Sequence, residues 1–288
     1  MKTTPPTDVN QAALWNGHAG RAWVASRTAL DQMFQPLEDQ LVEAVSAQRA
    51  QHVLDVGCGT GSTTLAIARQ LGANGSCLGI DISAPMLQTA RERAQRETTP
   101  ARFVCADAQT YAFQPAAFDM IVSRLGVMFF DDPVAAFTNL RSAARDGAAL
   151  CFIAWRGPAD NPFMTAAERA AAPLLPNLPP RKPGAPGQFA FADRSRVTCT
   201  LAASGWTDID IQPVDVACTL PERELVPYLS RLGPVGLALQ EADSQTRTRV
   251  IDAMRTAFEP YVHGTEVRFT AACWIARARA TRVEAAHD

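Results

Sequence analysis

A glycine-rich turn between a β-rich run and a helical run constrains the fold of this chain more than any other feature. Residues 53–62 read Val-Leu-Asp-Val-Gly-Cys-Gly-Thr-Gly-Ser, which places Gly57, Gly59 and Gly61 directly after a predicted strand. Glycine permits a tight turn and lets a ligand approach the backbone closely. In a doubly wound α/β fold this position lies outside the carboxyl ends of the strands, where ligands bind. The motif therefore predicts a ligand site at the end of the first strand.

The rest of the chain largely alternates between short apolar runs typical of strands and runs with helical periodicity. Such alternation implies crossover connections, so we predict an α/β, doubly wound, Rossmann-like fold with a seven-stranded, mostly parallel sheet and helices on both faces. The predicted strands are 52–57, 76–81, 101–106, 118–123, 148–155, 209–216 and 267–276. The predicted helices lie within 11–46 and at 63–71, 85–96, 133–145, 164–172, 195–204 and 221–262. Ser83 is expected to cap the helix at 85–96, and Asp146-Gly147 to end the helix at 133–145.

The charge balance argues against a dedicated nucleic-acid binder. The 288 residues contain 27 Lys and Arg against 29 Asp and Glu, a formal net charge of −2. A protein that neutralises phosphates normally carries a basic excess, and none is present here.

Cysteine and histidine usage predicts a reducing compartment and no metal centre. The seven cysteines are odd in number, widely spaced and without a C-x-x-C pair, and the four histidines are scattered. These cysteines are typical of small buried apolar residues. Residues 1–10 lack the apolar core of a signal peptide, and no apolar run approaches the roughly 20 residues of a membrane-spanning helix. We therefore expect a cytoplasmic protein without a membrane span.

An acidic residue at the end of the second predicted strand narrows the choice of ligand. Asp81 follows the glycine-rich turn by about 20 residues, the spacing at which a carboxylate meets a ribose diol in dinucleotide-binding folds. A nicotinamide site would have glycine where this chain has Ser62, and the lysine of a phosphate-binding P-loop is absent. The pattern favours a nucleoside-containing cofactor of another kind.

Several motifs, in the right order, resemble the class I S-adenosylmethionine-dependent methyltransferases. Asp55-Val-Gly-Cys-Gly-Thr-Gly61 resembles the first motif of that family, and Asp81 resembles the carboxylate that binds the ribose hydroxyls. Asp107 in Cys105-Ala-Asp-Ala108 resembles the residue beside the adenine. Phe118-Asp-Met-Ile-Val122 and Asp146-Gly-Ala148 resemble the motifs of the fourth and fifth strands. The likeness covers about residues 50–155 and is closest to ubiquinone- and menaquinone-biosynthesis-type and related small-molecule methyltransferases.

The resemblance implies a methyl transfer from S-adenosylmethionine by in-line displacement, with S-adenosylhomocysteine as the product. The protein would hold the two reactants at attack distance and exclude water. For Asp55, orientation of the methionine part and stabilisation of the loop both remain open. The implied cofactor-binding residues are Asp55, Gly57, Cys58, Gly59, Gly61, Asp81, Ile82, Asp107, Ala108 and Ser123.

The turn after the fourth strand points to a small-molecule acceptor. Enzymes of this class that methylate amino groups of nucleic-acid bases or protein amides usually carry Asn/Asp-Pro-Pro-Tyr/Phe there, whereas this chain has Ser123-Arg-Leu-Gly126. Clustered Asp and Asn ligands of the metal-dependent type are also missing at this turn, so no metal is expected. We expect an aromatic or partly apolar acceptor, with the methylated atom (O, N, S or C) left open.

The expected acceptor pocket contains Trp15, Trp23, Arg124, Met128 and Trp155. The two N-terminal tryptophans either close over the cofactor or pack an amphipathic helix onto the core. Arg124 either anchors an anionic acceptor or forms a structural ion pair. His18 is an acid–base candidate, with an ordinary surface histidine as the alternative.

Four segments are expected. They are an N-terminal helical lid (1–46), a cofactor-binding core (47–155), a Pro-rich variable loop or cap (156–192) and the C-terminal part of the sheet (193–288) with a helical insertion (221–262). Two other functions stay open: a non-catalytic S-adenosylmethionine-binding module and an NAD-dependent oxidoreductase.

Overall fold

A mostly parallel sheet forms the centre of the molecule in the computed structural model, which describes residues 10–178, 180–182 and 184–281. The order in the described residues is β3-β2-β1-β4-β5-β8-β6, with β7 paired to β8. Strands β1 to β5 are parallel, and β8 runs antiparallel to both β5 and β6. The strands are β1 (His52–Val56), β2 (Ser76–Asp81), β3 (Arg102–Cys105), β4 (Phe118–Arg124), β5 (Ala144–Trp155), β6 (Thr207–Pro221), β7 (Val262–His263) and β8 (Glu266–Ala280).

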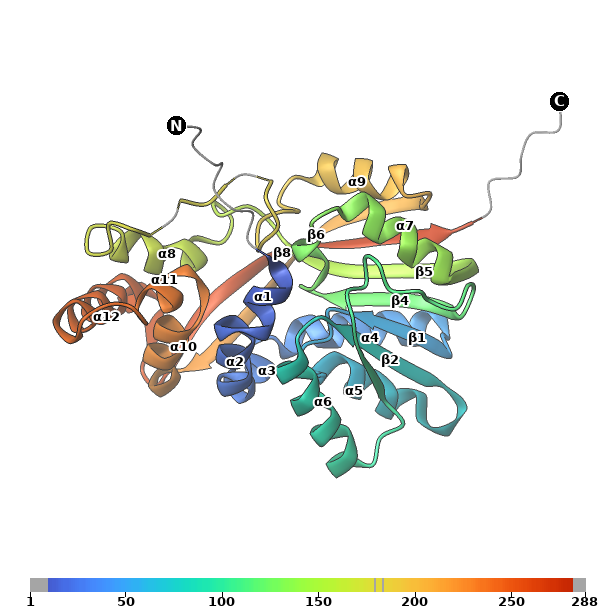
Figure 1. Cartoon of the computed structure of the whole chain (residues 1–288), viewed down its shortest axis with the longest axis horizontal. Helices are drawn as coiled ribbons and strands as arrows, with labels where there is room; N and C mark the ends of the chain where they lie inside the picture. Colours follow the sequence, from blue (N-terminus) through green and yellow to red (C-terminus); the bar gives the residue numbers. More distant parts are fainter. Residues whose placement is uncertain (1–9, 179, 183, 282–288) are drawn as a thin grey trace, which may run out of the picture.

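Helices cover both faces of the sheet. Helices α4 (Gln35–Gln48), α5 (Ser62–Leu71) and α6 (Ala84–Glu97) lie on one face, and α7 (Pro133–Ala143) and α9 (Arg194–Ala203) lie on the other (Figure 1). Burial on both faces explains why the central strands read as continuous apolar runs. The predicted doubly wound α/β fold is confirmed.

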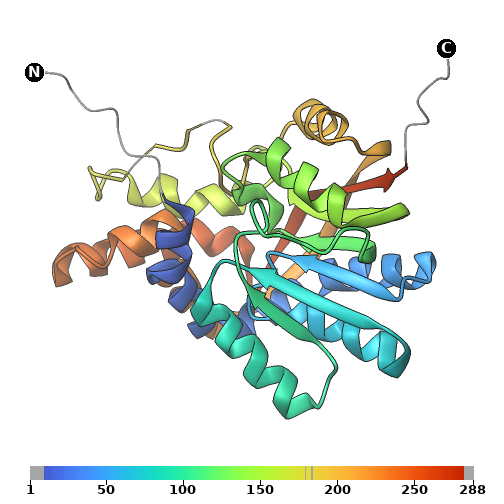
Figure 2. The ribbon, with the colours of Figure 1, turned by 45° about the vertical axis from the view of Figure 1, so that its right-hand side comes forward.

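Two long antiparallel strands carry a helical extension away from the parallel core. β6 and β8 each have 15 residues and stay paired from Thr207↔Arg279 to Pro221↔Glu266. Their far end meets α8 (Pro162–Ala171), α10 (Leu225–Arg231), α11 (Gly233–Ala238) and α12 (Ser244–Phe258), the group on the left of Figure 1 and again at the left in Figure 2. We call these four helices the cap.

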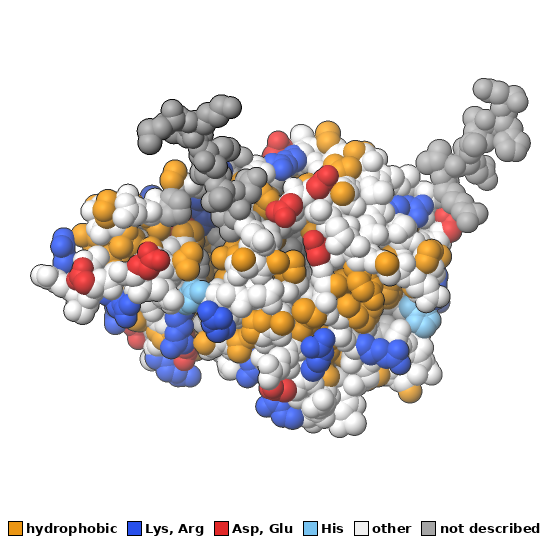
Figure 3. Space-filling model, in the orientation of Figure 1, with side chains coloured by type: hydrophobic (Ala, Val, Ile, Leu, Met, Phe, Trp, Pro, Cys, Tyr) orange, Lys and Arg blue, Asp and Glu red, His pale blue; other side chains and the backbone are white. Residues whose placement is uncertain are grey.

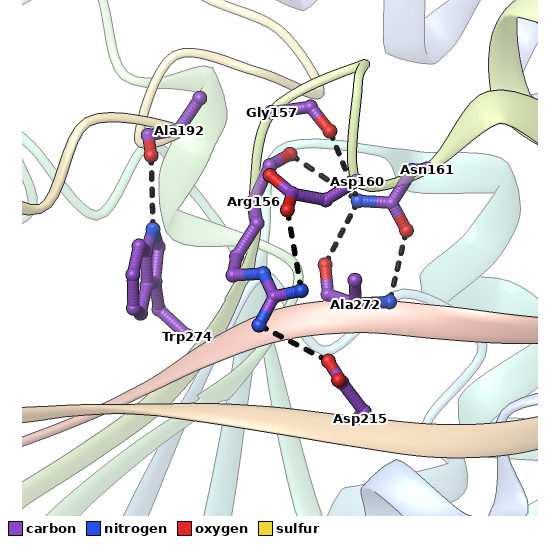
Figure 4. A network of polar contacts seen from close by, with 8 residues as sticks. All are labelled: Arg156, Gly157, Asp160, Asn161, Ala192, Asp215, Ala272 and Trp274. Atoms are coloured by element: carbon purple, nitrogen blue, oxygen red, sulfur yellow. Dashed lines mark hydrogen bonds and ion pairs between the residues drawn. The ribbon is translucent and has the colours of Figure 1, made fainter.

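The cap is fastened to the sheet where β5 ends. Asn161 is fully buried, accepts from the backbone N–H of Ala272 at 2.9 Å and donates to its carbonyl at 2.8 Å. Arg156 bridges Asp160 (3.3 Å) and Asp215 (3.1 Å) beside this clamp (Figure 4). The carbonyl of Ala272 also accepts from the N–H of Arg156 at 3.0 Å, so the amide of Asn161 replaces the partner that the N–H of Ala272 loses when β5 leaves the sheet.

The N-terminal segment forms four consecutive helices: α1 (Gln11–Asn16), α2 (His18–Ala25), α3 (Arg27–Met33) and α4. The first three lie between the cap and the parallel core (Figure 1). The helical prediction for 11–46 agrees with the structure, whereas residues 1–9 and 282–288, together with 179 and 183 in the Pro-rich loop, lie outside the described residues.

Several boundaries differ from the sequence prediction. The helix predicted at 133–145 ends at Ala143, because the chain already pairs as β5 from Ala144, and Gly147 lies within that strand. The helical region predicted at 221–262 consists of α10, α11 and α12, and the two-residue β7 adds an eighth strand. None of the described helices has the length and apolar character required to cross a membrane.

Candidate functional site

A cavity of about 280 Å³ lies at the carboxyl ends of β1, β2 and β4, under the N-terminal helices. This is the edge of the sheet at which the glycine-rich turn was expected to bind a ligand. Ten of the predicted site residues line it: Trp15, Trp23, Gly57, Cys58, Gly59, Asp81, Ile82, Asp107, Ala108 and Arg124.

The glycine-rich turn passes close beneath the loop after β4. Gly57 has φ +67°, and a Cβ there would lie 2.7 Å from Cα of Gly126. A Cβ on Gly126 would in turn lie 2.6 Å from the carbonyl oxygen of Val56. The two glycines allow both loops to meet at the floor of the cavity, and the sequence analysis gave no role to Gly126.

Asp81 connects the second strand with the turn. Its carboxylate accepts from the backbone N–H of Gly59 at 2.8 Å and from that of Ser83 at 2.8 Å. Burial raises the pKa of Asp81, and the backbone N–H donors partly offset the rise. The carboxylate thus holds the turn in shape while lining the cavity.

The adjacent wall comes from the loop after β3. Asp107 accepts from the backbone N–H of Gln109 at 2.8 Å, and Ala108 is buried beside it. Asn139 of α7 donates to the carbonyl oxygens of Ala108 and Tyr111 at 2.9 Å each. These bonds fix the loop against α7, so that Asp107 and Ala108 face the same cavity as Asp81.

Three predicted cofactor residues lie behind the cavity wall instead of lining it. Asp55 is 1% exposed and accepts from Thr64 at 2.6 Å, which ties β1 to α5. Ser123 is also 1% exposed and donates to the carbonyl oxygen of Val56 at 2.7 Å. Gly61 begins α5 with φ +83°, and a Cβ there would meet Ala90 at 2.9 Å. Within the described structure these residues support the turn.

Aromatic side chains form another part of the cavity wall. Trp15 packs edge-on against Trp23 (ring centroids 6.2 Å apart) and against Phe129 (5.1 Å), and all three line the cavity. Arg124 also lines it and donates to the carbonyl oxygen of Phe34 at 3.3 Å.

Two expected pocket residues lie in the hydrophobic core and do not line this cavity. Met128 is 1% exposed and Trp155 is 3% exposed. Trp155 packs between Phe34 and Phe163, with ring centroids 5.8 Å and 6.1 Å away. The 3₁₀ turn at Val127–Phe129 directs Met128 inward, and the neighbouring Phe129 and Phe130 reach the cavity instead.

His18 does not line the cavity either. Its Nε2 atom lies 3.4 Å from the carbonyl oxygen of Arg231 and 3.2 Å from Nε2 of Gln240, both in or next to the cap. The structure therefore places this acid–base candidate at the contact between α2 and the cap.

Helix α1 is bonded directly to the loop that carries Asp81. Asn16 accepts from the backbone N–H of Ala84 at 2.9 Å and donates to the carbonyl oxygen of Ile82 at 2.9 Å. Ser83 occupies the predicted N-cap position of α6, but its hydroxyl donates to the carbonyl oxygen of Trp15 at 2.7 Å. Asn16 supplies the cap instead, from a helix distant in sequence.

Helix α3 contributes a row of cavity residues that the sequence analysis missed. They recur at helical spacing on one face, a signal that also fits simple core packing. The row is Arg27, Leu30, Asp31 and Phe34.

Residues 53–147 match the methyltransferase domain family. This segment is a class I, S-adenosylmethionine-dependent methyltransferase domain. It contains the glycine-rich turn, Asp81 and Asp107, so the match covers the floor and one wall of the cavity. Residues outside the matched segment supply the N-terminal helices and the cap.

Known relatives of the methyltransferase domain act on small molecules according to their names. The aklanonic acid methyltransferase DauC of Streptomyces sp. (strain C5) is 30% identical over 122 residues, which cover 42% of this chain and 56% of the relative. A demethylmenaquinone methyltransferase of Lactiplantibacillus plantarum is 32% identical over 115 residues, which cover 39% and 48%. The chain thus spans about half the length of these curated relatives.

The fold around the domain is shared with solved structures. A protein described under "Conversion of a Disulfide Bond into a Thioacetal Group during Echinomycin Biosynthesis" superposes with a TM-score of 0.56 at 19% identity. The superposition covers 85% of this chain and 82% of the other. At this identity the likeness concerns the fold alone.

Proposed function

We propose that this protein transfers a methyl group from S-adenosylmethionine to a small aromatic or partly apolar molecule. The observation that carries the proposal is the joining of the glycine-rich turn to Asp81 by the Gly59 N–H bond, at the edge of one cavity. A ligand can therefore approach the backbone of Gly57 and Gly59 closely, beside the fixed carboxylate of Asp81.

The described residues fit the cofactor. We assign the ribose hydroxyls to Asp81 and the adenine end to Asp107 and Ala108, with the turn at Gly57 and Gly59 beneath the remainder. The cofactor supplies a methyl group that its sulfonium has already made electrophilic. The chain's task is then to hold both reactants in line and to keep water out.

The acceptor class follows from the aromatic wall and from the relatives. Trp15, Trp23 and Phe129 offer flat apolar surface to the cavity. Basic and acidic side chains stand as separate groups around the face shown in Figure 3, with hydrophobic ones between them, and do not form a continuous basic surface. This supports a small apolar acceptor over a nucleic acid.

We assign a role to each segment on the same basis. Residues 1–46 act as a lid, 47–155 hold the cofactor, and 156–192 with the insertion 221–262 shape the acceptor side, within the C-terminal part 193–288. All seven cysteines are unpaired, which supports a reducing compartment such as the cytoplasm.

Calorimetry tests the cofactor assignment. S-adenosylhomocysteine should bind the wild-type protein, and Asp81→Ala should weaken binding about 10- to 100-fold because charge-assisted hydrogen bonds are lost. Asp252→Asn, on the exposed side of α12, is the matched control and should bind normally. Absence of wild-type binding, or displacement of the ligand by NAD, would contradict the assignment.

Methyl transfer itself is tested with labelled cofactor. The wild-type protein is incubated with S-adenosylmethionine labelled in the methyl group and an extract of small metabolites, and label in the organic phase is measured. Transfer that Asp81→Ala reduces supports the proposal. Cofactor binding without transfer to any extracted pool would favour the non-catalytic binding module.

A further inference from the structure

Helix α3 adds two charged side chains to the cavity, which is also lined by the charged side chains of Asp81, Asp107, Arg124 and Asp131. Arg27 and Asp31 lie one helical turn apart, on the same face as Leu30 and Phe34. The cofactor-binding motifs of the core do not include them.

Arg27 is near enough to Asp31 for its charge to lower the pKa of that carboxyl, but it has no directly bonded partner. It is half-buried and lines the cavity, yet it makes no hydrogen bond or ion pair within 4.0 Å to any residue that the structure describes. A guanidinium is a fork of donors suited to a carboxylate, and holding one half-buried with none of these donors bonded to a described residue is unfavourable. Its placement therefore calls for an anionic ligand group.

An ion pair of Asp31 with Arg93 ties α3 to the glycine-rich turn. Its carboxylate lies 3.0 Å from Nη1 of Arg93, and the two side chains are 22% and 13% exposed. The same Nη1 atom donates to the carbonyl oxygen of Thr60 in the turn at 2.9 Å. Burial raises the pKa of Asp31, and Arg93 is the strongest of the nearby cations that oppose the rise.

We propose that α3 recognises the amino-acid end of the cofactor, with Arg27 receiving its carboxylate and Asp31 its ammonium group. This inference rests on the proposed function. The cofactor ends in a zwitterion, and one unpartnered cation beside one carboxylate complements it in charge. Asp81 and Asp107, which we assign to the adenosine, lie on other elements of the same cavity.

With this assignment, two parts of the protein bind different halves of the cofactor. The core holds the adenosine half of the ligand, and a helix of the lid holds the amino-acid half. A ligand that lacks the amino-acid half engages the core without engaging α3, so lid closure depends on the intact cofactor or its product.

Two ligands that differ only in this half provide the test. S-adenosylhomocysteine carries the aminocarboxylate, and 5′-methylthioadenosine lacks it. Binding of both is measured by calorimetry on wild type, Arg27→Gln and Asp31→Asn. Arg21→Gln is the matched control, because Arg21 lies on α2 of the same N-terminal segment, is exposed and is not among the residues that line the cavity.

Arg27→Gln is expected to weaken S-adenosylhomocysteine about 10- to 100-fold and to leave 5′-methylthioadenosine within about twofold. Asp31→Asn should weaken the first ligand selectively too, since an amide can still accept from Arg93 but no longer offers a charge. Arg21→Gln should change neither ligand.

Equal losses for both ligands, or no loss in Arg27→Gln, would overturn the inference while leaving the proposed function intact. If wild type binds neither ligand, the proposed function itself fails. Circular dichroism of each variant establishes that the fold is retained, and Arg27→Gln breaks no bond to a described residue.

Discussion

The buried carboxyl of Asp55 makes the stability of the protein depend on pH. Burial raises its pKa from 3.8 to about 7, and the hydrogen bond from Thr64 only partly opposes the rise. The protonated form is therefore favoured in the folded protein relative to the unfolded chain. Stability should fall as the pH rises from about 4 to about 7 and change no further above that range through this group.

The variant Asp55→Asn isolates this effect. Its free energy of unfolding, measured with urea between pH 4 and pH 8, should lose less than that of wild type as the pH rises. The difference is expected to grow by at most about 1.4 kcal/mol per pH unit within the window. Asp252→Asn, an exposed change, should follow the wild-type curve. Parallel curves for Asp55→Asn and wild type would show that Asp55 keeps an ordinary pKa.

At the scale of residues, the sequence predicted which residues lie near the site better than it predicted which way their side chains point. The motif placed Asp55, Gly61 and Ser123 at the carboxyl edge of the sheet, but the side chains of Asp55 and Ser123 bond to groups behind the cavity wall, and Gly61 packs closely against Ala90. Whether Met128 or Phe129 faces the cavity depends on one 3₁₀ turn, which no spacing rule specifies. Arg27 and Asp31 escaped notice because an amphipathic helix explains their spacing equally well.

At the scale of elements, long-range side-chain bonds replace local ones at two important points. Asn16 caps α6 from α1, and Asn161 completes the pairing of β8 where β5 departs. Neither role is readable from sequence, because capping and strand patterns are local and these partners are 66 to 111 residues apart.

Removal of the two hydrogen bonds of Asn16 should loosen the attachment of the N-terminal helices. Asn16→Ala takes away two hydrogen bonds between α1 and the loop at Ile82–Ala84, at a cost of about 1 kcal/mol. Hydrogen exchange of the amides in residues 11–25 should become faster in the ligand-free protein. Asn74→Ala, an exposed change in another turn, should leave that exchange unaltered. Unchanged protection in Asn16→Ala would mean that packing alone retains α1.

Removal of the hydrogen bonds between Asn161 and Ala272 should destabilise the junction between the cap and the sheet. Asn161→Ala leaves the N–H of Ala272 without its buried partner and removes one of the two hydrogen bonds to the C=O, which keeps the bond from the N–H of Arg156, so we expect a loss of about 1–3 kcal/mol in the free energy of unfolding. Urea denaturation measures it. Asn161→Asp should be destabilising as well, because a carboxylate cannot donate to the carbonyl. The exposed Asn177→Ala serves as control, and a loss no larger than that control's would show that Asn161 is dispensable.

At the scale of the whole molecule, the order of elements from β1 to β5 followed from periodicity and turn residues, and the comparisons cover the same region. The arrangement of the cap did not follow, because its four helices pack mainly on one another. Local patterns indicate helices there without indicating which surfaces they meet.

Cofactor binding should stabilise the whole molecule, since the site joins the lid to the core. At a concentration 100 times its Kd, S-adenosylhomocysteine contributes about 2.7 kcal/mol and should raise Tm by roughly 4–5 °C. Differential scanning calorimetry of wild type and Asp81→Ala at the same ligand concentration measures the effect, which should fall to about 0.4–1.4 kcal/mol in the variant. A Tm insensitive to ligand in both proteins would separate binding from stability.

The pairing of Pro221 with Glu266 has a practical consequence. The chain leaves β6 at one member of a cross-strand pair and enters β8 at the other, after the two-residue β7 that pairs with the start of β8. The members of such a pair are only about 5 Å apart. Residues 222–265 are thus an insertion between two paired strands, and the two ends of the insertion lie side by side. The segment 222–265 can therefore be replaced by another segment whose ends meet without altering the register of β6 and β8. Chimaeras with new acceptor preferences are best joined at Pro221 and Glu266.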